Sequence, residues 1–154
     1  MRNPWDVHAF APDRLLVLGG VTIPYERGLD GHSDGDALTH ALVDALLGAA
    51  TLGDLGSYFP SNDSRWKGQP GKVFLASVFD VVCWQHQWRI GNIDATIVDA
   101  HIPAMRSYLA EHLHVERERV SVKATTTDAL GFAGRGEGIA CYAVVLLERD
   151  GRED

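Results

Sequence analysis

The sequence predicts an α/β sandwich, in which helices pack against a β-sheet. Segments with the two-residue alternation of a strand are interleaved with segments whose apolar residues recur every three or four positions, as in a helix. The clearest helix is residues 37–50, and residues 139–147 form a strand apolar enough for the centre of a sheet. The 154 residues are expected to form a single domain over 1–154, with 148–154 as a frayed tail.

The remaining elements follow from local composition. Residues 7–23 have strand character, are broken at Pro12-Asp13 and contain the turn signal Gly19-Gly20. Residues 52–67 are rich in glycine, asparagine, aspartate and serine, as in an ordered loop. The same patterns predict a helix over 71–86, a strand over 93–98, a helix from 102 or 103 to 114 with Pro103 in its first turn, and a strand over 120–124.

Composition excludes several classes of protein. With 45% hydrophobic and 23% charged residues the chain is a globular protein, and its formal net charge of -7 argues against nonspecific binding to nucleic acid. No run approaches the roughly 20 apolar residues of a membrane helix, and the N-terminus has no signal-peptide pattern. Cys83 and Cys141 are too few for a disulfide framework, so we expect reduced thiols and a cytoplasmic protein without membrane partners.

The start of the first helix carries candidate functional side chains. Ser33, Asp34 and Asp36 are all good N-cap residues. Asp36, His40 and Asp44 stand four residues apart and therefore align along one side of the helix, where they could manage a cation or a proton. The alternative interpretation of this line is an ordinary solvated helix face.

Two further ligand-type residues precede this helix. Asp6 and His8 point the same way if their segment is a strand. Together with His40 they would give tetrahedral Zn²⁺ three protein ligands and leave the fourth position open, as in catalytic zinc sites. An Asp-x-His pair alone is common by chance, so the hypothesis depends on His40 lying nearby.

Longer motifs extend along nearly the whole chain. They include Asp6-x-His8, Leu18-Gly19-Gly20-Val21, Gly28-Leu29-x-Gly31-His32-Ser33-Asp34-Gly35-Asp36, Asp44-Ala45-Leu46-Leu47-Gly48-Ala49-Ala50, Lys123-Ala124-Thr125-Thr126-Thr127 and Gly131-Phe132-x-Gly134-Arg135-x-Glu137-Gly138. In this order they resemble the 2-C-methyl-D-erythritol 2,4-cyclodiphosphate synthase family. The resemblance implies a mixed sheet with helices on one face and a homotrimer with active sites between subunits.

The resemblance also implies an activity, that of a phosphorus-oxygen lyase of the methylerythritol phosphate pathway of isoprene biosynthesis. Such an enzyme cyclises 4-diphosphocytidyl-2-C-methyl-D-erythritol 2-phosphate and releases CMP. It further implies zinc on Asp6, His8 and His40, and a second divalent ion, Mg²⁺ or Mn²⁺, on Asp128, where the family has Glu. His32 and Thr126 inherit the catalytic roles.

The substrate-binding residues implied by the resemblance are Asp6, His8, His32, Ser33, Asp54, Gly56, Phe59, Ser61, Asp63, Thr125, Thr126, Thr127, Asp128, Phe132 and Arg135. Ser61 replaces an Asp that is common in the family. Phe132 and Arg135 resemble residues around a central cavity of the trimer that could hold an isoprenoid diphosphate, although Arg135 could instead form a structural salt bridge with Glu137.

One departure from the family lies after Ile97, where Val98-Asp99-Ala100 leads directly into His101 without the loop that holds the cytosine. The chain is therefore expected to be a divergent member. Two alternatives to the cyclase remain open: a divergent paralogue that acts on a non-cytidylyl diphosphate, and a non-catalytic trimeric module that binds isoprenoid diphosphate.

Overall fold

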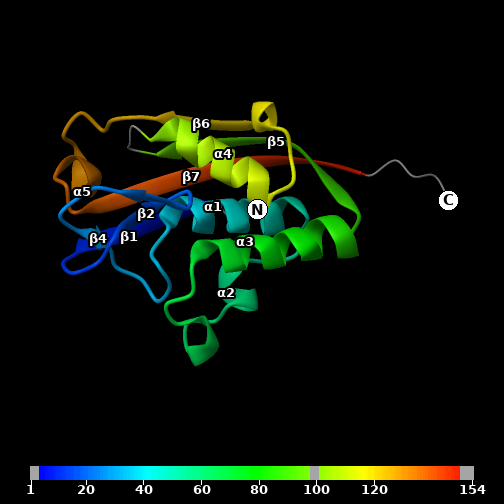
Figure 1. Ribbon diagram of the computed structural model, residues 1–154, viewed down its shortest axis with the longest axis horizontal. Coiled ribbons are helices and arrows are strands. Elements are labelled where there is room, and N and C mark those ends of the chain that lie inside the picture. Colours follow the sequence, from blue (N-terminus) through cyan, green and yellow to red (C-terminus); the bar gives the residue numbers. More distant parts are fainter. Residues whose placement is uncertain (1–3, 98–100, 150–154) are drawn as a thin grey trace.

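The computed structural model describes residues 4–97 and 101–149. Its main sheet has five strands in the order β4-β1-β7-β5-β6, and a separate hairpin joins β2 to β3 (Figure 1). The strands are β1 Trp5–Ala11, β2 Leu16–Leu18, β3 Val21–Ile23, β4 Gly28–Leu29, β5 Trp88–Ile97, β6 Val120–Ala124 and β7 Gly138–Arg149. β5 and β6 run parallel and the other neighbours antiparallel, which confirms the predicted mixed sheet with β7 at its centre.

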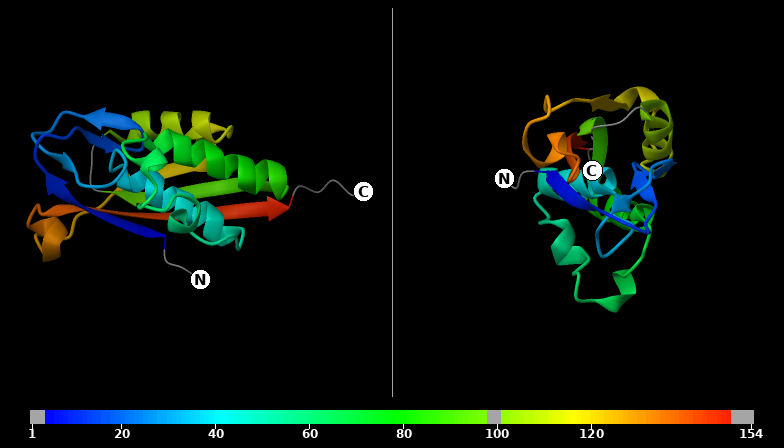
Figure 2. Two further views of the ribbon diagram at one scale, coloured as in Figure 1. Left: turned by 90° about the horizontal axis from the view of Figure 1, so that it is seen from below. Right: turned by 90° about the vertical axis from the view of Figure 1, so that its left-hand side faces the viewer.

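Helices cover one face of this sheet, as Figure 2 shows. The long helices are α1 Ala37–Ala49, α3 Gly71–Phe79 and α4 Ile102–His112; the short ones are α2 Leu55–Tyr58, η1 Ser64–Trp66, η2 Asp80–Gln85, η3 Arg117–Arg119 and α5 Gly131–Gly134. α1 packs on β7, α3 on α1, and α4 on β6. The opposite face of the sheet carries the exposed apolar side chains of Trp5, Val7, Tyr142, Val144 and Leu146.

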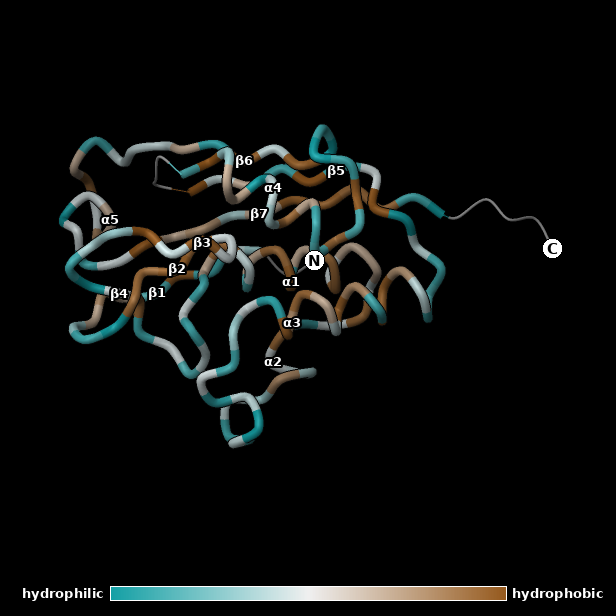
Figure 3. Tube along the Cα trace, in the orientation of Figure 1, coloured by the Kyte–Doolittle hydropathy of each residue, from teal (hydrophilic) through white to brown (hydrophobic). Residues whose placement is uncertain are grey.

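The core lies between α1 and the sheet. Leu38, Leu42 and Leu46 of α1 are fully buried, in agreement with the predicted apolar face. Burial of each such side chain contributes about 1.5–3 kcal/mol. Figure 3 shows hydrophobic residues gathered on the strands and on α1 and α3, and hydrophilic residues on the outer loops.

Asp36 is the N-cap of α1 and also holds the β2–β3 hairpin. Its carboxylate accepts hydrogen bonds from the Thr39 amide at 3.0 Å and hydroxyl at 2.7 Å, and from the amides of Gly19 at 2.8 Å and Gly20 at 2.7 Å. Both glycines have positive φ, and a Cβ on Gly20 would overlap the ring of Tyr108. The hairpin turn therefore depends on glycine, and the carboxylate of Asp36 is already used.

The predicted line of Asp36, His40 and Asp44 is accordingly wrong as a cation site. The Asp44 carboxylate accepts a hydrogen bond from the Leu55 amide at 2.7 Å, which anchors α2 to α1. Only His40 contributes to the cluster of ligands described below. Helical spacing placed the three residues on one side, but different neighbours pack against each of them.

Several other boundaries also differ from the predictions. The predicted loop 52–67 contains α2 and η1. The helix predicted over 71–86 is confirmed in its extent, because α3 is followed directly by the π-helical η2. β5 begins at Trp88 rather than at 93. Glu148 and Arg149 are not frayed, because they pair with Arg89 and Trp88 in the sheet.

Some predictions concern residues that the structure does not describe. The rest of the predicted tail, 150–154, and the shortened connection over 98–100 lie outside the described residues.

Cys83 and Cys141 are both free thiols. None of the helices in the described ranges has the length and apolar character needed to cross a membrane.

Candidate metal centre and cavity

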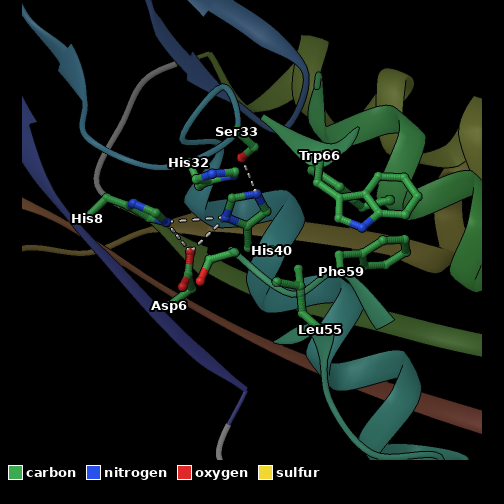
Figure 4. Close-up of a pocket in the computed structure, with 10 residues that line it drawn as sticks. Asp6, His8, His32, Ser33, His40, Leu55, Phe59 and Trp66 are labelled. Atoms are coloured by element: carbon green, nitrogen blue, oxygen red, sulfur yellow. Dashed lines mark hydrogen bonds and ion pairs between the residues drawn. The ribbon is translucent and has the colours of Figure 1, made fainter. Parts of the chain in front are cut away.

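Asp6, His8 and His40 converge at the wall of a cavity (Figure 4). Asp6 Oδ2 lies 2.9 Å from His8 Nε2 and 3.3 Å from His40 Nδ1, and the two imidazole nitrogens are 3.3 Å apart. The pleat of β1 turns Asp6 and His8 to the same side. His40 comes from the buried face of α1, one turn after its N-cap. The predicted convergence of these three residues is confirmed.

Each of the two histidines has a further contact on the ring nitrogen that points away from Asp6. The Nδ1 atom of His8 contacts the carbonyl oxygen of Asp30, and this oxygen can only accept. The Nε2 atom of His40 lies 3.0 Å from the hydroxyl of Ser33. When both nitrogens donate to these oxygens, His8 Nε2 and His40 Nδ1 each turn a lone pair toward Asp6. Three electron-pair donors then share one small space, which calls for a cation or a proton.

The donor set fits a metal ion. Asp6 Oδ2 is a buried oxygen that makes no directed hydrogen bond among the described residues, although both imidazoles lie close to it. Ligand atoms about 2.0–2.1 Å from a tetrahedral Zn²⁺ are separated by about 3.3 Å. The three separations of 2.9–3.3 Å match this geometry. Asp6, His8 and His40 would therefore hold such an ion with little movement.

The protonation equilibria of the cluster are shifted. Burial alone would raise the pKa of Asp6, but the adjacent imidazoles of His40 and His8 outweigh burial and lower this pKa to about 2. Burial alone would lower the pKa of His8, but the Asp6 carboxylate outweighs burial and raises it. Without a metal, the cluster therefore holds a carboxylate and favours a protonated imidazole beside it.

The cavity has a polar and an apolar side and a volume of about 170 Å³. His32, Ser33 and Ser61 line it beside the metal ligands. The apolar side consists of Leu55, Phe59, Trp66 and Phe74. The three aromatic rings form a contiguous cluster, with the Phe59 ring centred 4.8 Å from that of Phe74 and 5.0 Å from that of Trp66. A ligand that binds here would present a charged group to the histidines and a carbon skeleton to the rings.

Leu55, Trp66 and Phe74 are not among the residues that the sequence predicts for the site. Leu55 and Trp66 belong to the predicted loop 52–67, and Phe74 belongs to the predicted helix 71–86. The available signal was the presence of large apolar residues in an otherwise polar segment, which requires a surface for them to cover.

Comparison with known proteins places the chain in a family. The YgbB family model matches residues 3–148. The chain belongs to the YgbB family. A Geobacter metallireducens protein named 2-C-methyl-D-erythritol 2,4-cyclodiphosphate synthase is 54% identical over 151 positions, which cover 94% of this chain and 96% of that protein.

Two solved structures are also similar to this YgbB-family chain. The bifunctional IspDF from Campylobacter jejuni matches with a TM-score of 0.90 and 40% identity over 96% of this chain, which corresponds to 41% of that longer protein. The IspF of Plasmodium falciparum in its CDP complex matches with a TM-score of 0.80 and 28% identity, over 94% of this chain and 92% of that one.

Three of the predicted binding residues lie next to the cavity in the sequence but do not line it. Asp54 is the N-cap of α2 and accepts hydrogen bonds from the amide and the hydroxyl of Ser57 at 2.8 and 2.6 Å. Gly56 lies within the same helix. Asp63 is the N-cap of η1 and pairs with Arg65. Both carboxylates thus stabilise the segment that carries Phe59, Ser61 and Trp66.

The other predicted site residues do not line this cavity within one chain. They are Thr125, Thr126, Thr127, Asp128, Phe132 and Arg135, which follow β6 or belong to α5 and its C-cap. Asp128 has a positive φ of 51°, and its amide donates to the Thr126 hydroxyl at 3.0 Å. The structure also contains the predicted alternative for Arg135, an ion pair with Glu137 at 2.7 Å.

Proposed function

We propose that this chain is a 2-C-methyl-D-erythritol 2,4-cyclodiphosphate synthase. In this reaction an oxygen of the substrate's 2-phosphate attacks the β-phosphorus of 4-diphosphocytidyl-2-C-methyl-D-erythritol 2-phosphate. The bond from that phosphorus to the oxygen bridging the two phosphates breaks, and CMP leaves with the bridging oxygen. The observation that carries the proposal is the cluster of Asp6, His8 and His40 on the wall of a cavity. Family membership and the names of the relatives support it.

Zinc is the ion proposed for this cluster, because two imidazoles and one carboxylate are ligands typical of tetrahedral Zn²⁺. When bound, zinc supplies a Lewis acid that draws charge from a phosphate oxygen. His8 and His40 are oriented for such an ion by Asp30 and Ser33. His32 lines the same cavity, where it would donate a proton or hydrogen bond to the phosphate oxygens as their charge develops.

The methylerythritol part of the substrate would lie against the apolar side of the cavity. Phe59 and the neighbouring rings exclude water from the carbon skeleton, and the Ser61 hydroxyl can bond a polyol oxygen. Asp54, Gly56 and Asp63 shape this side through α2 and η1. Exclusion of water favours attack by the substrate's own phosphate over hydrolysis.

A homotrimer is proposed to complete the site. The open face of the sheet, with the five exposed apolar side chains named above, provides an apolar surface for a neighbouring copy. Thr125, Thr126, Thr127 and Asp128 would then reach the cavity of the neighbour, with Asp128 holding Mg²⁺ or Mn²⁺ at the diphosphate. Phe132 and Arg135 would face a central cavity able to take an isoprenoid diphosphate.

We propose a cytoplasmic location.

A second candidate function is cyclisation of a non-cytidylyl diphosphate on the same scaffold. The observation that favours it is the short connection from Ile97, the end of β5, to Ile102, the start of α4. A non-catalytic module is less favoured, because the full ligand cluster faces the cavity.

Release of CMP tests these alternatives. The purified protein is incubated with the diphosphocytidyl substrate, with EDTA or with Zn²⁺ and Mg²⁺, and CMP is measured by chromatography while ³¹P NMR follows the cyclic product. CMP formation that requires metal and is lost in His40→Ala, but not in the exposed control His86→Ala, supports the cyclase. Turnover of another diphosphate alone supports the second candidate. Binding without turnover contradicts both.

A further inference from the structure

One short segment supports both histidines of the metal cluster. The carbonyl oxygen of Asp30 contacts His8 Nδ1, and the hydroxyl of Ser33 lies 3.0 Å from His40 Nε2. His32, between these two residues, lines the cavity. Residues 30–33 therefore set the orientation of two proposed ligands and of one proposed catalytic group.

This segment packs closely against the metal ligands. A Cβ atom on Gly31 would lie 3.0 Å from the His8 ring, which is tighter than an ordinary contact. Ser33 is buried, with 7% of its surface exposed. A shift of residues 30–33 would thus change the contacts that the Asp30 carbonyl makes with His8 and the Ser33 hydroxyl makes with His40.

Arg14 holds this segment from outside the cavity. It lies in the connection between β1 and β2, and its Nη1 donates to the Gly31 carbonyl at 2.9 Å while its Nη2 donates to the Ser33 carbonyl at 2.6 Å. Nη1 also lies 3.6 Å from the carboxylate of Asp30. A planar guanidinium can span two carbonyls in this way, whereas the single ammonium of a lysine has no such fork.

We propose that Arg14 is a positioning residue of the metal centre. By holding the carbonyls of Gly31 and Ser33, it keeps Asp30 against His8 and Ser33 against His40, so that both ligand nitrogens face Asp6. Groups that contact a metal ligand directly, as Asp30 and Ser33 contact these histidines, commonly change metal affinity by about 10–100-fold when they are removed, and Arg14 holds the segment that carries both. The inference rests on the proposed metal-dependent function, and Arg14 does not line the cavity.

The segment has other attachments that would keep it folded without Arg14. The Asp30 amide donates to the Ala9 carbonyl at 2.8 Å, and the Gly68 amide donates to the His32 carbonyl at 2.8 Å. Loss of Arg14 is therefore expected to loosen the Gly31 and Ser33 ends of the segment rather than to unfold it.

The test compares Arg14→Ala and Arg14→Lys with a matched control, Arg106→Ala. Arg106 also donates to two backbone carbonyls, those of Val120 at 2.6 Å and Arg117 at 3.1 Å, at α4 and away from the cavity. Zinc affinity is measured by competition with a chromophoric chelator, and the visible absorption of the Co²⁺-loaded protein reports the ligand geometry. We expect zinc affinity about 10–100-fold weaker in Arg14→Ala and an altered Co²⁺ spectrum, with Arg14→Lys intermediate and Arg106→Ala unchanged.

Thermal unfolding of the metal-free variants separates positioning from a general loss of stability. If Arg14→Ala does not fold, Arg14→Lys carries the test. Zinc affinity and Co²⁺ spectra like those of the wild type in the folded Arg14 variants, or an equal loss in Arg106→Ala, would overturn the proposal. If the wild type itself binds no metal, the proposed function fails instead, so the two failures are distinguishable.

Discussion

The hydroxyl of Ser33 lies 3.0 Å from Nε2 of His40, inside the protein. This contact leaves Nδ1 of His40 to face Asp6 and His8 at 3.3 Å from each. A loop residue thus determines how a helix residue presents its lone pair to Asp6 and His8.

Substitution of Ser33 is therefore expected to weaken metal binding. In Ser33→Ala the Nε2 nitrogen of His40 loses its partner, so the ring can rotate or change tautomer, and zinc affinity should fall about tenfold or more. Competition with a chelator measures this change. Ser107→Ala, which removes a hydroxyl that bonds the Pro103 carbonyl on α4, is the control and should bind zinc normally. Equal affinity in both variants would contradict the role of Ser33.

The metal-free protein is expected to lose stability in acid through Asp6. Its folded-state pKa of about 2 lies below the ordinary value of 3.8, so the paired carboxylate stabilises the fold above about pH 4. This contribution, up to about 2 kcal/mol, is lost as the pH falls toward 2. Urea unfolding of the metal-free wild type and Asp6→Asn across this range measures it. The difference between them should shrink with acid; a constant difference would rule out the Asp6 contribution.

The raised pKa of His8 predicts a second limit at higher pH. A raised folded-state pKa stabilises the metal-free protein below the unfolded value of about 6.5, and this stabilisation is lost as the pH rises through the folded value. Zinc must displace that proton, so its affinity should increase with pH until His8 is neutral. Titration with zinc at several pH values, with proton release followed by an indicator, measures the effect. Affinity independent of pH between 6 and 8 would exclude it.

Asp36 is expected to matter for stability far more than Asp44 does. Asp36→Ala removes a buried helix cap and leaves the amides of Gly19 and Gly20 without their acceptor, at a cost of about 3 kcal/mol or more. Asp44→Ala loses one hydrogen bond to the Leu55 amide, at about 1 kcal/mol. Denaturant unfolding compares the two variants. A smaller loss for Asp36→Ala than for Asp44→Ala would show that the hairpin does not depend on this carboxylate.

Shared active sites predict that two inactive variants restore activity when they are combined. His40→Ala removes a zinc ligand and Thr126→Ala a group proposed to act in the neighbour's cavity. In trimers assembled from equal amounts of both, about a quarter of the sites would combine two intact halves and recover that share of activity. CMP release from co-refolded mixtures measures it. Recovery no greater than in either variant alone would contradict a site built from two subunits.

Interactions between residues close in the sequence made much of the fold predictable. The apolar period and the cap residues located α1, and the alternation along β1 placed Asp6 and His8 on one side. The convergence of these two residues with His40 was a hypothesis that the motifs supported and the structure confirmed. These features depend on interactions between residues close in the sequence, or on motifs long enough to be specific.

Other features depend on which distant segments pack together. The sequence alone could not show that Asp36 binds the Gly19-Gly20 turn or that Trp66 and Phe74 share a wall with the histidines. Side-chain spacing determines the direction in which a residue points, so it placed Asp6 and His8 on the same side of β1. The partner that each side chain meets there is decided by tertiary packing, and this is why Asp36 is a structural cap while His40, one turn along the same helix, lies beside Asp6 and His8.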